Sequence, residues 1–364
     1  MGESGKKAMI AMSGGVDSSV AALLMLRDGF DCTGVTMRLY REPGFAAACA
    51  KSCCSDEDEE DAAFVCQQMG IPHESACFSR LFEQRVIRKF IREYESGRTP
   101  NPCIDCNRYL KFDRLVKYAD EQGMEYVVTG HYARIEYDRE KERYLLKKAL
   151  DRSKDQSYVL YMLTQEQLER IRFPLGGLRK SEVREIAERQ GFCNARKHDS
   201  QDICFVPDGD HGRFLARFRG RELPEGKVLN ERGEVVGTHK GAAQYTVGQR
   251  KGLGIGFGER TFVQAIVPLR KEVVLGTRDD LARSVIRAAD ANWIAPVPIG
   301  VPFRVQVKIR YRSAAAEATV TAGADGTVTA RLDEPRFGVA PGQSLVCYWK
   351  DRLIGGGIIA ENRE

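Results

Sequence analysis

One segment near the N-terminus restricts the fold more than any other. The short apolar run Lys7–Met12 is followed at once by Ser-Gly-Gly-Val-Asp-Ser-Ser at Ser13–Ser19, and a helical pattern with Val20, Leu23 and Leu24 on one face comes next. Two glycines let the backbone approach phosphate groups, successive N–H groups form an anion-binding nest, and the helix N-terminus adds positive potential. The segment therefore predicts a strand, a pyrophosphate-binding loop and a helix.

The side chains of this loop refine the prediction. Ser13, Ser18 and Ser19 add hydroxyl donors. Asp17 repels a bare phosphate, so we expect it either to orient the loop or to hold Mg²⁺. The string is not the GxxxxGK[ST] of ordinary kinases and GTPases, which occurs nowhere in the chain. A glycine-serine turn without a ligand is the alternative, and the strand before it and the helix after it argue against that.

Two further residues suit an adenosine site. Met37, at the end of the next strand-like run, packs either on a purine or in the ordinary core. Gly130 follows the apolar run Tyr126–Thr129, where a glycine allows a nucleotide to approach closely.

The first 200 residues alternate between strand-like and helix-like segments. This order predicts a parallel sheet with helices on both faces, and ligands bind such sheets beyond the carboxyl ends of the strands. The expected strands are Lys7–Met12, Cys32–Leu39, His73–Cys77 and Tyr126–Thr129, and the expected helices after the first are Asp58–Met69, Phe82–Tyr94 and Arg108–Glu121.

The pattern changes after about residue 210. Glycine-rich sequence with short strands runs to about residue 275, and from Phe303 β-branched runs alternate with turn signals such as Gly323–Gly326 and Pro341–Gly342. The second part reads as a small β-barrel or sandwich. We place the domain boundaries at 1–212, 213–282 and 283–364. The fold class expected is α/β, with a parallel-sheet nucleotide-binding domain, a small mainly β central domain and a C-terminal β-barrel.

Charge and hydropathy exclude some classes. The net charge of +5 permits a nucleic-acid partner without requiring one. No apolar run approaches the length that spans a bilayer, and Met1–Lys7 lacks the apolar centre of a secretion signal, so we expect a cytoplasmic enzyme with no membrane partner. The acidic run Asp56–Asp61 reads as a helix start favoured by the macrodipole. Phe303–Arg312, with four basic residues and no acid, is either a solvated strand face or a phosphate contact.

The chain contains eleven cysteines, an odd number with irregular spacing. This argues against a secreted disulfide framework and leaves core thiols, metal ligands or reactive thiols. Cys49, Cys53, Cys54 and Cys66 cluster along the chain; they either bind a metal or are scattered structural thiols, and we favour the latter.

Two cysteine segments carry candidate chemistry. Thr99–Asn107 holds two prolines and a CxxC pair, Cys103 and Cys106, and we expect a rigid turn ending where the helix Arg108–Glu121 begins, capped by Asp105 or Asn107. A cysteine at a helix N-terminus has a stabilised thiolate, which suits a nucleophile, although structural thiols are the alternative.

The other segment, Lys197–Phe205, contains Cys204 between Ile203 and Phe205. Taken alone, Cys204 fits a core position as well as a second thiol of the same site.

These strings together resemble the bacterial tRNA-specific 2-thiouridylase family, within the ATP pyrophosphatase superfamily, along essentially the whole chain. The loop by itself is similar to the SGGxDS loop of that superfamily, whose members cleave ATP between the α and β phosphates. The matching strings are Met12–Ser19, Thr99–Asn107, Gly130–Ala133, Lys154–Ser157, Ser200–Phe205, Arg310–Arg312 and Pro341–Gln343.

The resemblance implies roles for particular residues. Cys106 matches the nucleophilic cysteine and Cys204 the cysteine that carries a persulfide. The residues expected to bind ATP are Ala11, Met12, Ser13, Gly14, Gly15, Val16, Asp17, Ser18, Met37 and Gly130. Those expected to contact tRNA are Asn101, Pro102 and Cys103 beside the target base, with His131, Lys154, Asp155, Gln156, Arg310, Tyr311 and Gln343.

The implied reaction is 2-thiolation of the wobble uridine of tRNA. ATP with Mg²⁺ adenylates the C2 oxygen, the anticodon stem-loop presents an extruded base, and sulfur comes from the Cys204 persulfide. A cysteine desulfurase or sulfur carrier protein would load that persulfide. Cys106 releases the sulfur by reduction or by direct thiol exchange, which leaves a Cys106–Cys204 disulfide.

Alternatives follow from one departure from the family pattern. The position three before the nucleophile, often Asp, is Cys103 here, so Cys103, Cys106 and Cys204 could instead hold an iron–sulfur cluster with one open iron. A small-molecule synthetase needs no paired cysteines, and a zinc- or iron-binding RNA module leaves the loop unexplained. Enzymes of cytidine or 4-thiouridine thiolation share the loop but not the two cysteine strings.

Overall fold

The computed structural model describes residues 5–40, 56–199, 203–253 and 261–360. The chain forms two compact units. One contains Met1–Val86, Cys103–Pro207 and Asp351–Leu353, and the other contains Ile87–Pro102, Asp208–Lys350 and Ile354–Glu364. Each unit is therefore built from separate stretches of the chain. Within the described ranges, no helix is long and apolar enough to cross a membrane.

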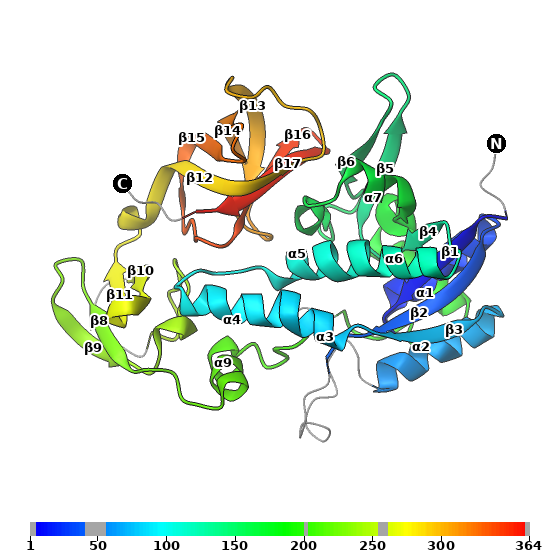
Figure 1. Cartoon of the computed structure of the whole chain (residues 1–364), viewed down its shortest axis with the longest axis horizontal. Coiled ribbons are helices and arrows are strands. Elements are labelled where there is room, and N and C mark those ends of the chain that lie inside the picture. The colour runs from blue at the N-terminus through cyan, green and yellow to red at the C-terminus, as the bar shows by residue number, and fades with distance from the viewer. Residues whose placement is uncertain (1–4, 41–55, 200–202, 254–260, 361–364) are drawn as a thin grey trace. The chain divides into compact units, whose positions relative to one another are not determined.

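The first unit is built on a parallel sheet, as predicted (Figure 1). Its strands lie in the order β3-β2-β1-β4-β7, and each adjacent pair is parallel. The strands are β1 (Lys7–Met12), β2 (Asp31–Arg38), β3 (His73–Cys77), β4 (Tyr126–Val128) and β7 (Ile171–Arg172). Because β1 lies in the centre, the loop that follows Met12 emerges at the middle of the carboxyl edge.

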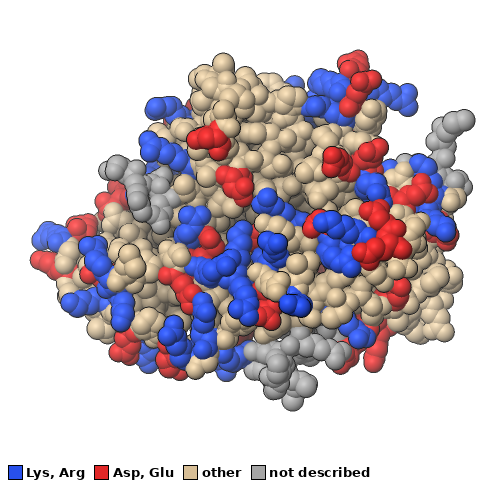
Figure 2. Space-filling view, in the orientation of Figure 1, with Lys and Arg blue, Asp and Glu red and all other residues tan. Residues whose placement is uncertain are grey.

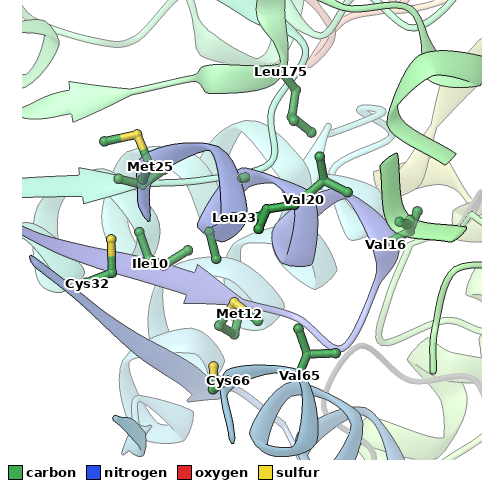
Figure 3. Packing of buried hydrophobic residues seen from close by; sticks show 14 of the residues in the cluster. Ile10, Met12, Val16, Val20, Leu23, Met25, Cys32, Val65, Cys66 and Leu175 are labelled. Atoms are coloured by element: carbon green, nitrogen blue, oxygen red, sulfur yellow. The ribbon is translucent and has the colours of Figure 1, made fainter. Parts of the chain in front are cut away.

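Helices pack on this sheet through small and branched side chains. Helix α1 (Val16–Arg27) and helix α2 (Asp56–Met69) contribute Val16, Val20 and Val65 to one buried cluster with Ile10 and Met12 of β1. Figure 3 shows these side chains in one cluster with Cys66, which points into the core. Burial raises the pKa of the Cys66 thiol to about 12, so Cys66 is an inert structural thiol. Cys49, Cys53 and Cys54 lie outside the described residues.

Two expected helices are longer and less regular than the sequence indicated. The expected helix Phe82–Tyr94 consists of α3 (Ser79–Phe82), a π-helical stretch Glu83–Ile87 and α4 (Arg88–Glu95). The expected helix Arg108–Glu121 begins earlier, at α5 (Pro102–Cys106), and continues through π-helical Asn107–Arg114 into α6 (Leu115–Glu121).

The prediction of a turn up to Cys106 with a cap at Asp105 or Asn107 was therefore wrong. Pro102 is the first residue of the helix. Proline is favourable there, because the N–H of the first helical residue makes no hydrogen bond within the helix. Asp105 and Asn107 are buried inside the helical run, and Asn107 Nδ2 donates to the Val159 carbonyl at 3.1 Å.

The rest of this unit was not recognised from the sequence. It comprises the hairpin β5 (Ala133–Asp138) and β6 (Arg143–Lys148), helix α7 (Gln165–Arg170) and helix α8 (Lys180–Arg189). Arg352 and Leu353 pair antiparallel with the outer edge of β6. The first residue of helix α8, Lys180, reaches the phosphate loop.

The second unit contains a small sheet and a barrel, as predicted. Helix α9 (His211–Arg219) precedes the sheet, whose order is β10-β11-β8-β9. The sheet strands are β8 (Gly226–Leu229), β9 (Val235–His239), β10 (Phe262–Val267) and β11 (Glu272–Gly276). Only the β11–β8 pair is parallel.

The barrel follows the order β12-β15-β14-β13-β16-β17 and closes by pairing of β12 with β17. Its strands are β12 (Ala282–Trp293), β13 (Phe303–Lys308), β14 (Ala316–Ala322), β15 (Val328–Phe337), β16 (Ser344–Trp349) and β17 (Arg352–Ile359). Alternating residues such as Val305, Val307, Ala318 and Val320 fill the interior. The long strand β12 was missed from the sequence.

Basic residues are balanced locally by acids. On β13, Arg304 makes two bonds of 2.6 Å to the Asp333 carboxylate, so it belongs to a solvated strand face. Figure 2 shows basic and acidic side chains interspersed over the visible face. Charge alone therefore does not select a nucleic-acid partner.

Candidate phosphate loop and cysteine sites

The loop after β1 has the geometry of an anion-binding turn. Helix α1 begins at Val16 with Gly15 in extended conformation as its N-cap. Gly14 has φ +68°, and a Cβ there would lie 2.2 Å from the Asp58 carbonyl oxygen. Glycine is therefore required at this position both by conformation and by close approach of α2.

Two serines of the loop were expected to offer hydroxyl donors to phosphate, but they are engaged in the loop itself. Ser18 Oγ and Ser19 Oγ donate to the Gly15 carbonyl at 2.9 and 3.2 Å. Ser13 N–H donates to Ser18 Oγ at 3.2 Å. These bonds fix the turn. The two hydroxyl groups could donate to a phosphate only after rotating away from the Gly15 carbonyl.

Asp17 is held by a lysine that sequence reasoning missed. Lys180 Nζ lies 2.7 and 2.8 Å from the two Asp17 carboxylate oxygens, and Tyr132 Oη donates to Asp17 Oδ1 at 2.8 Å. Of the two roles predicted for Asp17, this geometry supports orientation of the loop. A signal was present in the sequence: Lys180 opens a helix, where a cation opposes the macrodipole and needs a carboxylate partner.

Asp199 joins three basic residues behind the loop. Its carboxylate lies 2.8 Å from Lys180 Nζ, 2.7 Å from Lys154 Nζ and 2.9 Å from Arg184 Nη2. Burial alone would raise its pKa, but hydrogen bonds from Lys154 and Lys180 hold the pKa at about 2. Asp17, Lys180 and Asp199 thus form a continuous chain of charges, which we call the loop-anchoring network.

This network predicts a loss of stability in acid. The folded pKa of Asp199 lies below the ordinary value of 3.8, so its contribution is complete above about pH 4 and is lost as pH falls towards 2. A shift of this size corresponds to about 2 kcal/mol. Urea titrations of wild type and Asp199→Asn between pH 2 and 6 measure the free energy of unfolding of each protein. The difference between the two free energies should shrink as the pH falls from about 4 towards 2. A pH-independent difference would contradict the assignment.

The acidic start of α2 does more than favour its macrodipole. Lys197 Nζ lies 2.7 Å from Asp58 Oδ1 and 2.6 Å from Asp61 Oδ2, and Arg38 pairs with Glu59 at 2.6 Å. Asp58 and Asp61 thereby fix the chain just before Asp199, whereas Glu59 ties α2 to β2. Asn194, in the same segment, donates from Nδ2 to the Gly14 carbonyl at 3.0 Å and to Ser19 Oγ at 2.9 Å.

The other residues predicted to bind ATP lie at the same edge of the sheet. Ala11 and Met12 are buried at the end of β1, and Met37 is half-buried near the end of β2. A Cβ on Gly130 would lie 2.9 Å from the Asp17 carbonyl carbon and Cβ. Gly130 is thus needed for close packing on the loop, and its predicted contact with ATP stays a prediction.

His131, which is expected to contact tRNA, is buried in an aromatic cluster. The imidazole is 6% exposed and packs against the rings of Phe112 and Phe173, at centroid distances of 5.6 and 5.5 Å. Its Nδ1 is 2.7 Å from Thr129 Oγ1, and burial lowers the pKa well below its usual value. His131 is thus a neutral residue of the core in this structure, and its predicted contact with tRNA stays a prediction.

Cys106 closes the helical turn α5 instead of lying at a helix start. Its side chain is half-buried, and Cys103 and not Cys106 occupies the first turn. The macrodipole argument for the Cys106 thiolate therefore fails. The Cys103 side chain is solvent-exposed. Asn101 and Pro102 directly precede this turn.

Cys204 is half-buried with a free thiol, and its neighbour anchors the segment. Phe205 is buried and packs edge-to-face on Phe82 of α3 at 5.7 Å between centroids. Ser200–Asp202 lie outside the described residues. The ring of Phe205 thus fixes Cys204 at the end of the Asp199 segment.

Among the predicted tRNA contacts of this unit, two serve local structure. Asp155 accepts from Ala149 N–H at 3.0 Å and from Ser157 Oγ at 2.9 Å, and Gln156 Oε1 accepts from Tyr132 N–H at 2.9 Å. Lys154 is half-buried and pairs with Asp199. Their contacts with tRNA stay predictions.

In the second unit, Gln343 and Arg310 also bind backbone. Gln343 Nε2 donates to the Thr99 carbonyl at 2.9 Å, and Thr99 N–H donates to the Pro341 carbonyl at 2.7 Å. Arg310 donates to the carbonyls of Val247 and Gly338. Tyr311 lies under the Lys308 ammonium, 5.9 Å from its ring centroid.

No metal centre is evident in the described part of the chain. It holds no group of three or more His, Cys, Asp or Glu side chains placed to bind a metal ion, although Cys103, Cys106 and Cys204 are all described. The three thiols predicted as possible cluster ligands therefore do not form a metal-binding group in this structure.

Comparisons with known proteins agree with this architecture. Residues 6–208 match a family model described as the tRNA methyl transferase HUP domain, residues 212–277 its PRC-barrel domain, and residues 283–359 an aminomethyltransferase β-barrel domain. The tRNA-specific 2-thiouridylase MnmA of Clostridioides difficile strain 630 is 45% identical over 98% of this chain and 99% of its own. The chain belongs to the tRNA-specific 2-thiouridylase family.

Other relatives extend the likeness. The tRNA-specific 2-thiouridylase MnmA of Acidithiobacillus ferrooxidans strain ATCC 53993 is 44% identical over 97% of this chain and 98% of its own. Among solved structures, a 4-thiouridine synthetase–RNA complex with bound ATP covers 58% of this chain and 50% of its own, with 19% identity and a TM-score of 0.38. NMN synthetase from Francisella tularensis covers 61% of this chain and 80% of its own, with 15% identity and a TM-score of 0.33. The 2-thiouridylase family, by contrast, matches over nearly the full length.

Proposed function

We propose that this chain is an ATP-dependent tRNA-uridine 2-sulfurtransferase that acts on the wobble uridine. The observation that carries the proposal is the phosphate loop, fixed at the carboxyl edge of a parallel sheet in a full-length 2-thiouridylase relative. Such a loop fits ATP, because its glycines, N–H groups and helix N-terminus all favour anionic oxygen.

ATP supplies the leaving group that the uridine lacks. The C2 oxygen attacks the α-phosphorus and the bond to pyrophosphate breaks, which converts a poor leaving oxide into AMP. Ser13–Ser18, Met37 and Gly130 are proposed to hold the nucleotide. Mg²⁺ would neutralise phosphate charge when bound with ATP. Asp17 is engaged by Lys180, so its part here is to hold the loop in shape.

Sulfur transfer is proposed to use two thiols. The terminal sulfur of a Cys204 persulfide attacks C2, AMP departs, and a C2–S–S–Cys204 adduct forms. The Cys106 thiolate then attacks the Cys204 sulfur, releasing 2-thiouridine and leaving a Cys106–Cys204 disulfide that an external dithiol reduces. In the other order, Cys106 attacks the persulfide first and releases hydrogen sulfide, which attacks C2. Both orders balance with one two-electron reduction for each turnover.

Partners follow from this chemistry. The substrate would be the anticodon stem-loop of tRNA, with Asn101, Pro102 and Cys103 next to the base and Lys154, Arg310, Tyr311 and Gln343 among the further contacts. A cysteine desulfurase or sulfur carrier protein would supply the persulfide. The domain boundaries at 1–212, 213–282 and 283–364 and a cytoplasmic location stay part of the proposal.

The test uses anaerobically purified full-length protein. Iron and sulfide are measured first, and unmodified tRNA is then incubated with ATP and a persulfide donor. We expect 2-thiouridine at the wobble position by mass spectrometry of nucleosides, with AMP and pyrophosphate as co-products. Activity of iron-free protein supports the persulfide route, whereas activity only with bound iron and sulfide supports a cluster on Cys103, Cys106 and Cys204. No thiolation under either condition would contradict the proposed function.

A further inference from the structure

Asn194 stands out among the buried side chains that the proposed reaction does not use. It lies after α8, is 2% exposed, and reaches the phosphate loop from a segment about 180 residues away in sequence. Both hydrogens of its amide are used, one on the Gly14 carbonyl and the other on Ser19 Oγ. The other end of the amide, Oδ1, is buried without a hydrogen-bond partner among the described residues. A buried unpaired acceptor costs free energy and is tolerated where position matters.

The bond to Gly14 determines where the next peptide group points. In a planar trans peptide, the carbonyl of one residue and the N–H of the next point in opposite directions. Because Asn194 holds the Gly14 carbonyl towards the interior, the Gly15 N–H is directed the other way, at the N-terminus of α1. That is the direction in which a phosphate group would approach the loop. The second bond, to Ser19 Oγ, ties the same amide to the first turn of the helix.

Resting on the proposed function, we infer that Asn194 is a positioning residue for ATP, which fixes the Gly14–Gly15 peptide in its phosphate-binding orientation. The carboxyl group of aspartate has the same shape but at most one hydrogen to donate. Replacement by aspartate therefore keeps the packing and removes the donors. A purely structural role predicts that Asn194→Asp and Asn194→Ala weaken every ligand to the same extent through lost stability, whereas a positioning role predicts a selective loss of affinity for ATP and pyrophosphate.

The experiment measures ligands that report on different parts of the site. Asn194→Asp and Asn194→Ala are each expected to raise the KM for ATP and the Kd for inorganic pyrophosphate about 10- to 100-fold, as expected for lost buried hydrogen bonds. The Kd for adenosine, which does not need the loop, should change less than twofold. The control is Gln68→Ala, which should behave as wild type. It removes an exposed hydrogen bond from Gln68 of α2 to the Gln190 carbonyl, at the C-terminal end of α8.

The outcomes separate the two claims. A near-normal KM for ATP in Asn194→Asp would overturn the positioning role, as would equal losses of adenosine and pyrophosphate affinity, which indicate general misfolding. If wild type itself neither binds ATP nor thiolates tRNA, the proposed function fails, independently of Asn194.

Discussion

Replacement of Cys106 by serine is expected to reduce tRNA thiolation by about a thousandfold or more, the scale on which loss of a nucleophile acts. ATP affinity should not change, because Cys106 belongs to α5 and not to the phosphate loop. With persulfide on Cys204, the variant should also accumulate a tRNA–protein conjugate through the C2–S–S–Cys204 bond if thiol exchange is direct. A non-reducing denaturing gel would show this conjugate, and dithiothreitol should release it.

Matched variants make this result specific. Cys204→Ser should abolish both thiolation and the conjugate. Cys193→Ser, which alters an exposed thiol near Asp61, should keep wild-type activity. Cys103→Ser should keep activity in the persulfide route and lose it if three thiols hold a cluster. Unchanged thiolation by Cys106→Ser would remove Cys106 from the mechanism, and inactivity without a conjugate would favour release of hydrogen sulfide.

Replacement of Lys180 by methionine is expected to destabilise the protein by on the order of 3 kcal/mol, because it leaves the carboxylates of Asp17 and Asp199 without a shared cation. Lys180 is 10% exposed in its side chain, so water cannot fully replace the ammonium group. The KM for ATP should rise at least tenfold as Asp17 and the loop lose their anchor. Urea denaturation and steady-state kinetics measure the two effects.

Lys147→Met supplies the control. Lys147 is 15% exposed and pairs with Glu136 on the β5–β6 hairpin, so it tests loss of a similarly covered ion pair away from the loop. We expect a loss of stability with an unchanged KM for ATP. If Lys180→Met and Lys147→Met change the KM equally, the loop-anchoring network has no specific role.

The sequence predicted those parts whose signal is local. The loop Ser13–Ser19 was found because glycines, a strand and a helix are contiguous there, and the alternating segments were enough to predict a parallel sheet. Cys66 was rightly favoured as a structural thiol because apolar residues at helical spacing surround it in α2.

The parts that escaped prediction depend on tertiary contacts. Lys180 and Asn194 contact the loop from more than 160 residues away, and Asp199 is linked to it only through Lys180, so no spacing rule connects these residues to the loop. His131 was expected to contact tRNA because it lies in the matching string Gly130–Ala133, and the sequence did not show that the rings of Phe112 and Phe173 pack on it. The helix start at Pro102 was missed because proline was read as a breaker, although at the first helical position it starts a helix.

The interleaving of the two units along the chain has a consequence for biosynthesis. Asp351–Leu353 belong to the first unit, where Asp351 bonds Arg134 at 2.8 Å and the Lys148 N–H at 2.8 Å. These contacts cannot form until nearly all of the 364 residues have left the ribosome. The edge of β6 in the first unit therefore stays unpaired until residues 351–353 have been synthesised. A chain that stops before residue 351 keeps that edge unpaired.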